Sequence, residues 1–165
     1  MNNNNSCNNN CNTCTSSCNT KCPICNKVGK SVPLITLKSL ISKNQELITD
    51  SNSYICVNRK CDVIYFQEGN PKYFTKSEIK TQIWFKSALK SQIICYCHNI
   101  LLTDILEIVN NSNDLNLTKE NIFNILNIKE TNECVYHNPL GESCDKLFKN
   151  AIEFAYKQKE NNNSN

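Results

Sequence analysis

Apolar residues in the first half of the chain form short runs, whereas those in the second half recur at helical spacing. The first half contains three runs rich in β-branched and aromatic residues: Tyr54–Cys56, Val63–Phe66 and Ile83–Phe85. Turn-forming residues at 68–71 follow the second run. Leucine and isoleucine at helical spacing predict one short helix over 36–41. The pattern therefore predicts a small β-rich unit over residues 20–86.

The second half, residues 87–158, is expected to be a helical unit. Thr103 is a candidate N-cap for a helix that extends to about Val109, and Thr118 is a candidate for a second helix with an apolar face. A third amphipathic pattern covers Asp145–Tyr156. Because these apolar stripes have the period of a helix, we expect them to share one core rather than to bind a cofactor.

Asparagine is densest at the two ends of the chain, and such a composition cannot build a core. We therefore expect disordered tails over residues 1–19 and 159–165. Between them the fold class is expected to be α+β, with a β-rich metal-binding unit followed by a helical metal-binding unit. A β-rich unit of this size has little core of its own, and a bound metal ion usually supplies the missing stability.

The charge and the motifs of the sequence exclude several classes of function. Lys and Arg total 18 and Asp and Glu total 15, and a net charge of +3 is too small to indicate a nucleic-acid partner. No apolar stretch approaches the roughly 20 residues of a membrane helix, and no basic-then-apolar leader precedes the first cysteines. We therefore expect a cytoplasmic protein without a membrane span. The hydrolase motifs G-x-S-x-G and H-E-x-x-H are both missing.

Cysteine changes this picture, with 12 copies in 165 residues. Stable disulfides are rare in a reducing compartment, so metal binding is the leading interpretation. The first cysteine group consists of a C-x2-C pair and a C-x4-C pair: Cys22, Cys25, Cys56 and Cys61. Four thiolates on two short turns suit a tetrahedral Zn²⁺ ion, and we expect a structural zinc site here.

The second cysteine group combines a C-x-C pair with a C-x9-C loop: Cys95, Cys97, Cys134 and Cys144. In an extended segment the two thiolates of C-x-C face the same way and can bind one iron or two adjacent irons. The Pro139–Gly141 turn is expected to fold the loop back so that its cysteines face the first pair, with loop N–H groups bonded to cluster sulfides. A structural zinc knuckle prefers two or more intervening residues. The spacing alone leaves a [2Fe-2S] cluster and a second zinc ion both open.

The third cysteine group lies in the Asn-rich N-terminal segment: Cys7, Cys11, Cys14 and Cys18. Soft thiolates in such a segment could bind Cu(I) or Zn²⁺. Nothing around them predicts a fold, so a low-complexity segment with incidental thiols is the preferred interpretation. His98 and His137 each lie close to a cysteine of the second group. Because four cysteines are already available there, we expect the histidines to support the ligands or face solvent.

Taken in order along the chain, the cysteine motifs resemble a known pattern. C-P-I-C at 22–25 is followed by the C-x4-C pair and the apolar run at 63–66. C-Y-C at 95–97 comes next, and the C-x9-C loop then holds N-P-L-G at 138–141. This combination resembles the N-terminal zinc and [2Fe-2S] portion of CopZ-type copper metallochaperones. The helical half also resembles the small [2Fe-2S] domains of bacterioferritin-associated ferredoxins.

The resemblance implies Zn²⁺ at the first cysteine group and a [2Fe-2S] cluster at the second. It also implies receipt of copper and one-electron reduction of Cu(II) to Cu(I). The partners it implies are a copper-carrying protein or a copper ATPase, together with an electron donor. The alternative is a redox-silent double-zinc interaction module, which would dock a partner through exposed aromatic residues: Tyr73, Phe74 or Trp84.

The sequence departs from the family pattern in three places. Tyr136 and Asp145 stand where the family's loop often carries further cysteines, so one ligand assignment could shift. The segment between the two cysteine pairs of the second group is longer, with Asn-rich residues around 110–116. Full-length members can carry a copper domain with an M-x-C-x-x-C motif, and the one methionine here is Met1. We therefore expect copper to bind the N-terminal segment, to bind transiently or to reach a separate protein.

Overall fold

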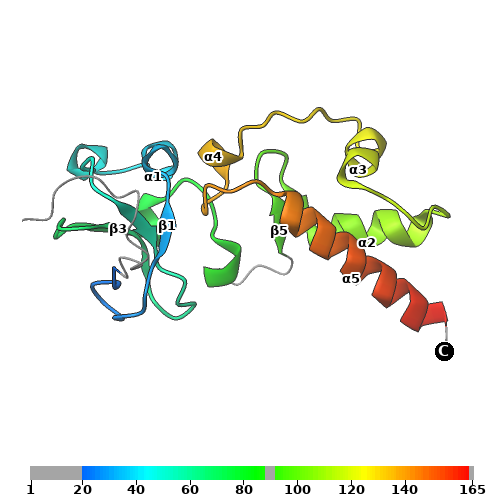
Figure 1. Ribbon diagram of the computed structural model, residues 1–165, viewed down its shortest axis with the longest axis horizontal. Coiled ribbons are helices and arrows are strands. Elements are labelled where there is room, and N and C mark those ends of the chain that lie inside the picture. The colour runs from blue at the N-terminus through cyan, green and yellow to red at the C-terminus, as the bar shows by residue number, and fades with distance from the viewer. Residues whose placement is uncertain (1–19, 88–91, 164–165) are drawn as a thin grey trace, which may run out of the picture.

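The structure is a computed structural model that describes residues 20–87 and 92–163. Figure 1 shows two bodies side by side, a small sheet at one end and a set of helices at the other. An antiparallel sheet combined with helices is the α+β fold class that the sequence predicts, and this prediction is confirmed. The third cysteine group lies outside the described residues: Cys7, Cys11, Cys14 and Cys18.

The first body is built on a four-stranded antiparallel sheet in the order β1-β2-β3-β4. Its strands are β1 (Lys30–Val32), β2 (Ser53–Ile55), β3 (Val63–Gln67) and β4 (Tyr73–Thr75). Tyr54 pairs with Phe66 across β2 and β3, and Val63 pairs with Thr75 across β3 and β4. All residues of β3 are buried, which makes this central strand the support for the elements on both sides of it.

The helices of the described residues fall mostly in the second body. They are α1 (Leu34–Leu40), α2 (Leu102–Asn111), α3 (Lys119–Ile125), α4 (Cys134–His137) and α5 (Asp145–Asn163), with short 3-10 helices at Gln45–Leu47, Lys76–Glu78 and Trp84–Lys86. Residues Leu37 and Leu40 of α1 are buried in the same core as Tyr65 and Phe74. The predicted helix over 36–41 therefore covers the sheet and closes the core of the first body.

The second body has one apolar core that α2 and α5 share, as predicted. It includes Ile105 and Val109 from α2, and Phe148 and Ala155 from α5. A two-stranded hairpin of β5 (Ile93–Cys95) and β6 (Ile100–Leu101) packs against these helices. The sequence analysis predicts helices alone in this half, because strands of two or three residues are too short to show a period.

Hydrogen bonds at the helix starts explain where α2 and α3 begin. Thr118 Oγ1 accepts a hydrogen bond from the Asn121 N–H at 3.3 Å, which confirms Thr118 as the cap of α3. The start of α2 differs from the prediction, since Thr103 lies inside the helix. The Leu101 N–H donates instead to the carboxylate of Asp104 at 2.8 Å, and the helix begins two residues earlier than a Thr103 cap would set.

The third predicted β run is wrong, because Trp84–Lys86 forms a 3-10 helix. The Trp84 N–H donates to the hydroxyl of Tyr96 at 3.3 Å, and Lys86 is drawn into the first body. The guanidinium of Arg59 lies 6.0 Å from the centre of the Trp84 ring. Contacts with two distant segments, at Tyr96 and at residues 58–63, thus override a local preference for a strand.

The sequence predicts a disordered tail from residue 159. This prediction is wrong for residues 159–163, because α5 continues to Asn163. Lys159 Nζ donates hydrogen bonds to the carbonyl oxygens of Val109 and Ser112 at 2.9 and 2.6 Å, at the end of α2. The hydroxyl of Tyr156 donates to the carbonyl of Asp114 at 2.8 Å. These tertiary hydrogen bonds hold the end of α5 in place although its composition favours disorder.

Candidate metal centres

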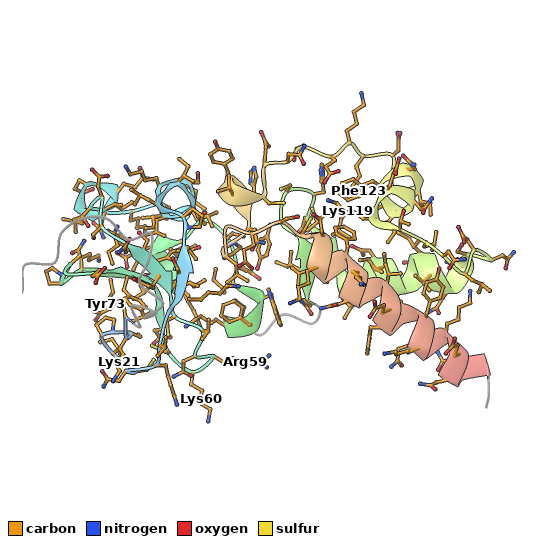
Figure 2. All side chains as sticks on the ribbon, in the orientation of Figure 1. Lys21, Arg59, Lys60, Tyr73, Lys119 and Phe123 are labelled. Atoms are coloured by element: carbon orange, nitrogen blue, oxygen red, sulfur yellow. The ribbon has the colours of Figure 1, made fainter. Side chains whose placement is uncertain are left out.

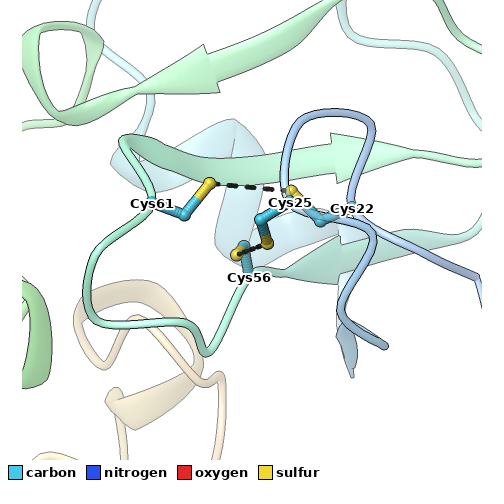
Figure 3. A group of neighbouring side chains, drawn as sticks. All are labelled: Cys22, Cys25, Cys56 and Cys61. Atoms are coloured by element: carbon cyan, nitrogen blue, oxygen red, sulfur yellow. Dashed lines mark hydrogen bonds between the residues drawn. The ribbon is translucent and has the colours of Figure 1, made fainter.

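The C-x2-C pair of the first cysteine group is shaped by a turn at the start of the described chain. The Cys22 N–H donates to the carbonyl of Lys27 at 2.8 Å, and the Asn26 N–H donates to the carbonyl of Cys22 at 2.9 Å. Asn26 adopts a positive φ of 56°, which asparagine tolerates better than most residues. The turn brings Cys22 and Cys25 to the same side of the loop (Figure 3).

The C-x4-C pair sits in the connection between β2 and β3. Cys56 follows β2 directly, and its N–H donates to the carbonyl of Ile64 at 2.8 Å. The Cys61 N–H donates to the carbonyl of Asn58 at 3.1 Å, which closes the turn two residues before β3 begins. Sheet pairing therefore fixes both ends of this loop.

The four sulfur atoms of the first cysteine group converge. The Sγ atoms of Cys22 and Cys61 are 3.8 Å apart, and those of Cys25 and Cys56 are 3.6 Å apart (Figure 3). All four lie within 4.8 Å of one another. Zn–S bonds of about 2.3 Å at tetrahedral angles place neighbouring sulfurs about 3.8 Å apart. The donor set and its spacing fit Zn²⁺.

Burial and hydrogen bonding give the thiols of the first cysteine group different pKa values. Burial raises the pKa of Cys56 to about 12 and also raises the pKa of Cys61. Burial opposes ionisation of Cys25 as well, but hydrogen bonds from the Asn58 side chain, the Lys27 backbone and neighbouring thiols lower its pKa to about 6. A metal ion must therefore displace protons from Cys56 and Cys61, whereas Cys25 offers a thiolate at neutral pH.

Lys86 supports the C-x4-C turn with a buried ammonium group. Its Nζ donates hydrogen bonds to the carbonyl oxygens of Asn58, Cys61 and Val63 at 2.9, 2.9 and 2.7 Å, and the residue is 5% exposed. Among the described residues, no carboxylate forms an ion pair with it. A buried positive charge without a carboxylate suits a site in which four thiolates carry net negative charge. The sequence analysis missed this residue, since nothing local distinguishes it from a surface lysine.

The C-x-C pair of the second cysteine group does not lie in a fully extended segment, contrary to the prediction. Cys95 is the last residue of β5, and residues 96–99 form the turn that leads to β6. Asn99 adopts a positive φ of 54° in that turn. The reason is the hairpin, which must reverse the chain directly after Cys95.

The C-x9-C loop folds back on itself, as the Pro139–Gly141 turn predicts. Cys134 is the first residue of α4 and Cys144 directly precedes α5. Their Sγ atoms are 3.9 Å apart. The thiols of Cys95 and Cys144 are hydrogen-bonded, and so are those of Cys97 and Cys134. All four predicted residues of the second cysteine group therefore line one small pocket.

The sulfur atoms of the second cysteine group are spread more widely than those of the first. Within residues 20–87 and 92–163, the first cysteine group is the one set with at least three ligand atoms mutually within 4.8 Å. In the second group the Sγ atoms of Cys134 and Cys144 are in contact, and Cys95 and Cys97 line the same pocket. A cluster of two irons shares four thiolates between two metal atoms and so needs a wider spread than a single ion.

A buried nitrogen without a hydrogen-bond partner also faces the second cysteine group. Of the buried side-chain N and O atoms in the described part of the chain, His98 Nε2 alone has no partner. His98 lines the pocket of the four cysteines, and its ring packs edge-on against Phe123 at 5.5 Å. Buried polar groups are nearly always satisfied, so this atom marks a place where a bound group would supply the missing acceptor. Four thiols beside a buried nitrogen without a partner could hold a metal ion or a metal cluster.

Lys119 brings a positive charge to the same pocket. Its Nζ donates to the carboxylate of Asp145 at 2.6 Å and to that of Glu130, and it lies 5.5 Å from the centre of the Phe123 ring. Figure 2 shows Lys119 and Phe123 together near the start of α5. Burial alone would lower the pKa of Lys119, but hydrogen bonds to Asp145 and Glu130 and the nearby Cys144 thiol raise it. The ammonium thus stays charged beside the cysteines.

The pKa values of Cys95 and Cys144 in the second group are shifted in opposite directions. A hydrogen bond from the Cys144 thiol lowers the pKa of Cys95 to about 6, and the same bond together with burial raises the pKa of Cys144. Burial and the neighbouring Cys134 and Cys95 raise the pKa of Cys97 to about 11. The second group, like the first, offers one thiolate at neutral pH and further thiols that a metal must deprotonate.

Tyr136 and Asp145, which depart from the family pattern, lie outside the pocket of the second cysteine group, and so does His137. Tyr136 and His137 are exposed on α4, and His137 lies 3.6 Å from the carboxylate of Glu133. Asp145 is engaged with Lys119 and with the hydroxyl of Ser143 at 2.5 Å. None of the three side chains lines the cysteine pocket.

The aromatic residues proposed for partner docking are not a common exposed surface. Phe74 is fully buried in the core of the first body. Tyr73 and Trp84 are half-buried. Phe74 is therefore not available to the docking surface of the double-zinc alternative, because β4 places it on the sheet face that α1 covers.

Comparisons with known proteins agree with the cysteine geometry. Residues 19–80 match the family model zf_CopZ, which is described as a zinc binding domain. The X-ray structure of the N-terminal domain of CopZ from Archaeoglobus fulgidus matches with a TM-score of 0.59 and 26% sequence identity. The match covers 79% of this chain and 96% of that one. No curated protein matches significantly.

No helix in the described residues is both long enough and apolar enough to cross a bilayer. The cysteines of the first group lie within the residues that match the family model. The resemblance predicted from the cysteine pattern is confirmed: the first body is similar to the zinc-binding domain of CopZ-type proteins, and its four-cysteine cluster fits Zn²⁺.

Proposed function

We propose that the protein is a zinc- and [2Fe-2S]-binding electron carrier that serves copper handling. In this proposal the first cysteine group holds a structural Zn²⁺, and the second holds a [2Fe-2S] cluster. The observation that carries it is the contrast between four mutually close sulfurs at one site and, at the other, four cysteines that line one pocket without converging on a single point.

The residues around the second cysteine group have roles that follow from their contacts. The four cysteines hold the cluster, which supplies one-electron transfer when bound. Lys119 keeps a positive charge beside Cys144 and offsets part of the negative charge of the thiolates. His98 Nε2 offers a buried donor for a cluster sulfur. The edge-on contact with Phe123 holds its ring in place.

The role in copper handling rests on the likeness to CopZ. Cu(II) would be the substrate, and one electron from the cluster would reduce it to Cu(I). The oxidised cluster would then be reduced again by an electron donor. A copper-carrying protein or a copper ATPase would receive the Cu(I). We place the protein in the cytoplasm in this proposal, where a reducing environment keeps thiols available.

Metal and sulfide analysis of anaerobically purified protein tests the proposal. We expect about two irons, about two acid-labile sulfides and about one zinc per chain, with an EPR signal after reduction by dithionite. Cys97→Ser should remove the iron and leave the zinc, and Cys56→Ser should do the reverse or prevent folding. Reduction of Cu(II), followed with a Cu(I)-specific chelator, should be lost in Cys97→Ser. A colourless protein with about two zinc ions, and without iron after anaerobic reconstitution, would decide for the double-zinc interaction module.

A further inference from the structure

A loop of the second body is docked on the first body. Residues 135–143, here called the latch loop, join Cys134 to Cys144 and pack against α1 and the sheet. The buried hydroxyl of Tyr65 donates to the carbonyl of Pro139 at 2.7 Å, and the buried hydroxyl of Thr36 donates to the carbonyl of Val135 at 2.7 Å. Leu140 packs on the core of the first body. Figure 1 shows α4, at the start of this loop, beside α1.

Gly141 leaves no room for a side chain between the latch loop and the first body. A Cβ atom there would lie 2.5 Å from the Pro33 side chain and 2.6 Å from the hydroxyl of Thr36, distances that real Cβ atoms do not show. Its φ of +66° also favours glycine. Glycine is therefore required here for two reasons. The positive φ disfavours other residues, and the contact with the first body leaves no space for a Cβ atom.

The latch loop is braced so that the docked residues and the cysteines move together. The side chain of Asn138, which is 4% exposed, donates to the carbonyl of Glu142 at 2.7 Å and accepts from the Leu140 N–H at 3.1 Å. The Asn138 N–H donates to the carbonyl of Cys134 at 2.8 Å. In the N-P-L-G motif, Asn138 thus stiffens the loop, and the next three residues contact the first body.

The docking residues of the first body are tied to the first cysteine group. Tyr65 lies on β3, which begins two residues after Cys61. Cys56 donates its N–H to the carbonyl of Ile64, the residue before Tyr65. A metal ion held by Cys56 and Cys61 therefore secures the strand from which Tyr65 reaches the latch loop.

We propose that the latch loop couples the two cysteine groups, so that zinc at the first group holds Cys134 and Cys144 in place for metal binding at the second. Tyr65 and Gly141 are the positioning residues of this coupling, and they touch neither metal. The importance of the coupling for cluster assembly rests on the proposed function. By linkage, a metal bound at the second group would raise the zinc affinity of the first group by the same factor by which zinc raises metal affinity at the second.

Hydrogen exchange in iron-free, zinc-loaded full-length protein tests the coupling. Gly141→Ala should raise the exchange rate of amides in residues 138–144 by at least about tenfold, because alanine at positive φ is strained and its methyl group displaces the loop. Gly69→Ala is the matched control, since Gly69 has a φ of +68° and no atom within 4 Å of a Cβ there. It should leave the latch loop unchanged.

A second pair of variants tests one hydrogen bond without altering the backbone. Tyr65→Phe should raise exchange of the latch loop roughly fivefold, whereas Tyr73→Phe in the same sheet should not. Zinc affinity should stay within about twofold of wild type in both, which distinguishes positioning from loss of the first body. Removing zinc with a chelator should release the latch loop in wild type and abolish the difference from Tyr65→Phe.

The outcomes separate this proposal from the proposed function. Equal exchange of the latch loop with and without zinc, or in Gly141→Ala and Gly69→Ala, would overturn the coupling even if wild type binds a [2Fe-2S] cluster. Zinc-dependent and Gly141-dependent protection would establish the coupling even if wild type takes up zinc rather than iron at the second group. In cluster-loaded protein, the coupling also requires faster cluster loss to an iron chelator in Gly141→Ala than in Gly69→Ala.

Discussion

The two cysteine groups use the same donor atom but are assembled by different parts of the fold. Both pairs of the first group lie at the ends of strands or on a turn closed by backbone hydrogen bonds. The second group depends on a hairpin turn and on a loop that crosses to the other body. The first site is thus built from local structure, whereas the second also depends on how its loop is docked on the first body.

The difference in assembly matches a difference in shape. Four mutually close sulfurs suit one ion, whereas four cysteines spread more widely around one pocket can serve two metal atoms. The positive charges beside the two groups differ as well. Lys86 stands at the first group without a carboxylate partner, while Lys119 at the second is held between Asp145 and Glu130. These contrasts teach that donor type alone does not identify the metal, and that spread and surroundings must be considered with it.

The largest effect is expected when a ligand of the first group is removed. Cys61→Ser should weaken zinc binding by at least about a hundredfold and cost the first body about 4 kcal/mol or more, because structural zinc supplies folding free energy. Zinc competition and thermal unfolding measure the two effects. Cys144→Ser is the matched change at the second group and should leave zinc affinity unchanged. Wild-type zinc affinity in Cys61→Ser would refute the assignment of the first group.

The pH dependence of zinc binding is the next largest effect. The pKa of Cys56 is about 12 and that of Cys61 is raised, so both thiols are protonated between about pH 6.5 and 8.5 and must release protons to the solvent when zinc binds. Raising the pH removes this competition, so affinity should rise about a hundredfold per pH unit from these two residues. Cys25 has a pKa of about 6 and is already a thiolate above that pH, so it adds little to the pH dependence of zinc affinity there. Calorimetry in buffers of different ionisation enthalpy counts the protons, and release of fewer than about one would contradict the prediction.

A smaller effect is expected for the buried lysine of the first group. Lys86→Met removes three hydrogen bonds and leaves carbonyl groups without donors, which should cost about 2 kcal/mol of stability in the zinc-loaded protein. Lys60→Met, at an exposed position of the same turn, should change stability by less than about 0.5 kcal/mol. Chemical denaturation of the two variants compares them directly. Equal stability would mean that the buried ammonium does not support the turn.

The smallest effect is expected at the lysine of the second group. Lys119→Met removes a positive charge beside Cys144 and should lower the reduction potential of the cluster by about 40 mV, equivalent to about 1 kcal/mol for one electron. The shift is modest because Asp145 and Glu130 already offset the charge. Lys149→Met on the exposed face of α5 should shift the potential by less than about 10 mV. Spectroelectrochemical titration measures both, and a higher potential in Lys119→Met would contradict the sign.

The sequence was sufficient for features that depend on local pattern. Helical spacing predicted α1 and the apolar faces of α2, α3 and α5, and β-branched runs predicted β2 and β3. Cysteine spacing predicted which thiols meet, since each pair lies on a turn of its own. The same local rules failed at Trp84–Lys86 and at the end of α5, where tertiary hydrogen bonds decide the structure.

Long-range contacts account for what the sequence could not predict. The bond between Tyr65 and Pro139 joins residues 74 positions apart, and no periodicity marks either of them as a partner. Nothing local in the sequence distinguishes Lys86, which the fold buries, or Lys119, which it leaves half-buried, from a surface lysine. The N-P-L-G motif was recognisable as a turn, but its contact with the first body depends on how the two bodies meet.

X-ray absorption at the zinc and iron edges of one anaerobic sample tests the central contrast most directly. The account predicts zinc with about four sulfur neighbours at about 2.3 Å and no second metal nearby. It predicts iron with about four sulfur neighbours and a close iron neighbour, as in a two-iron cluster. Zinc in both cysteine groups, or iron bound as isolated ions without an iron neighbour, would contradict it.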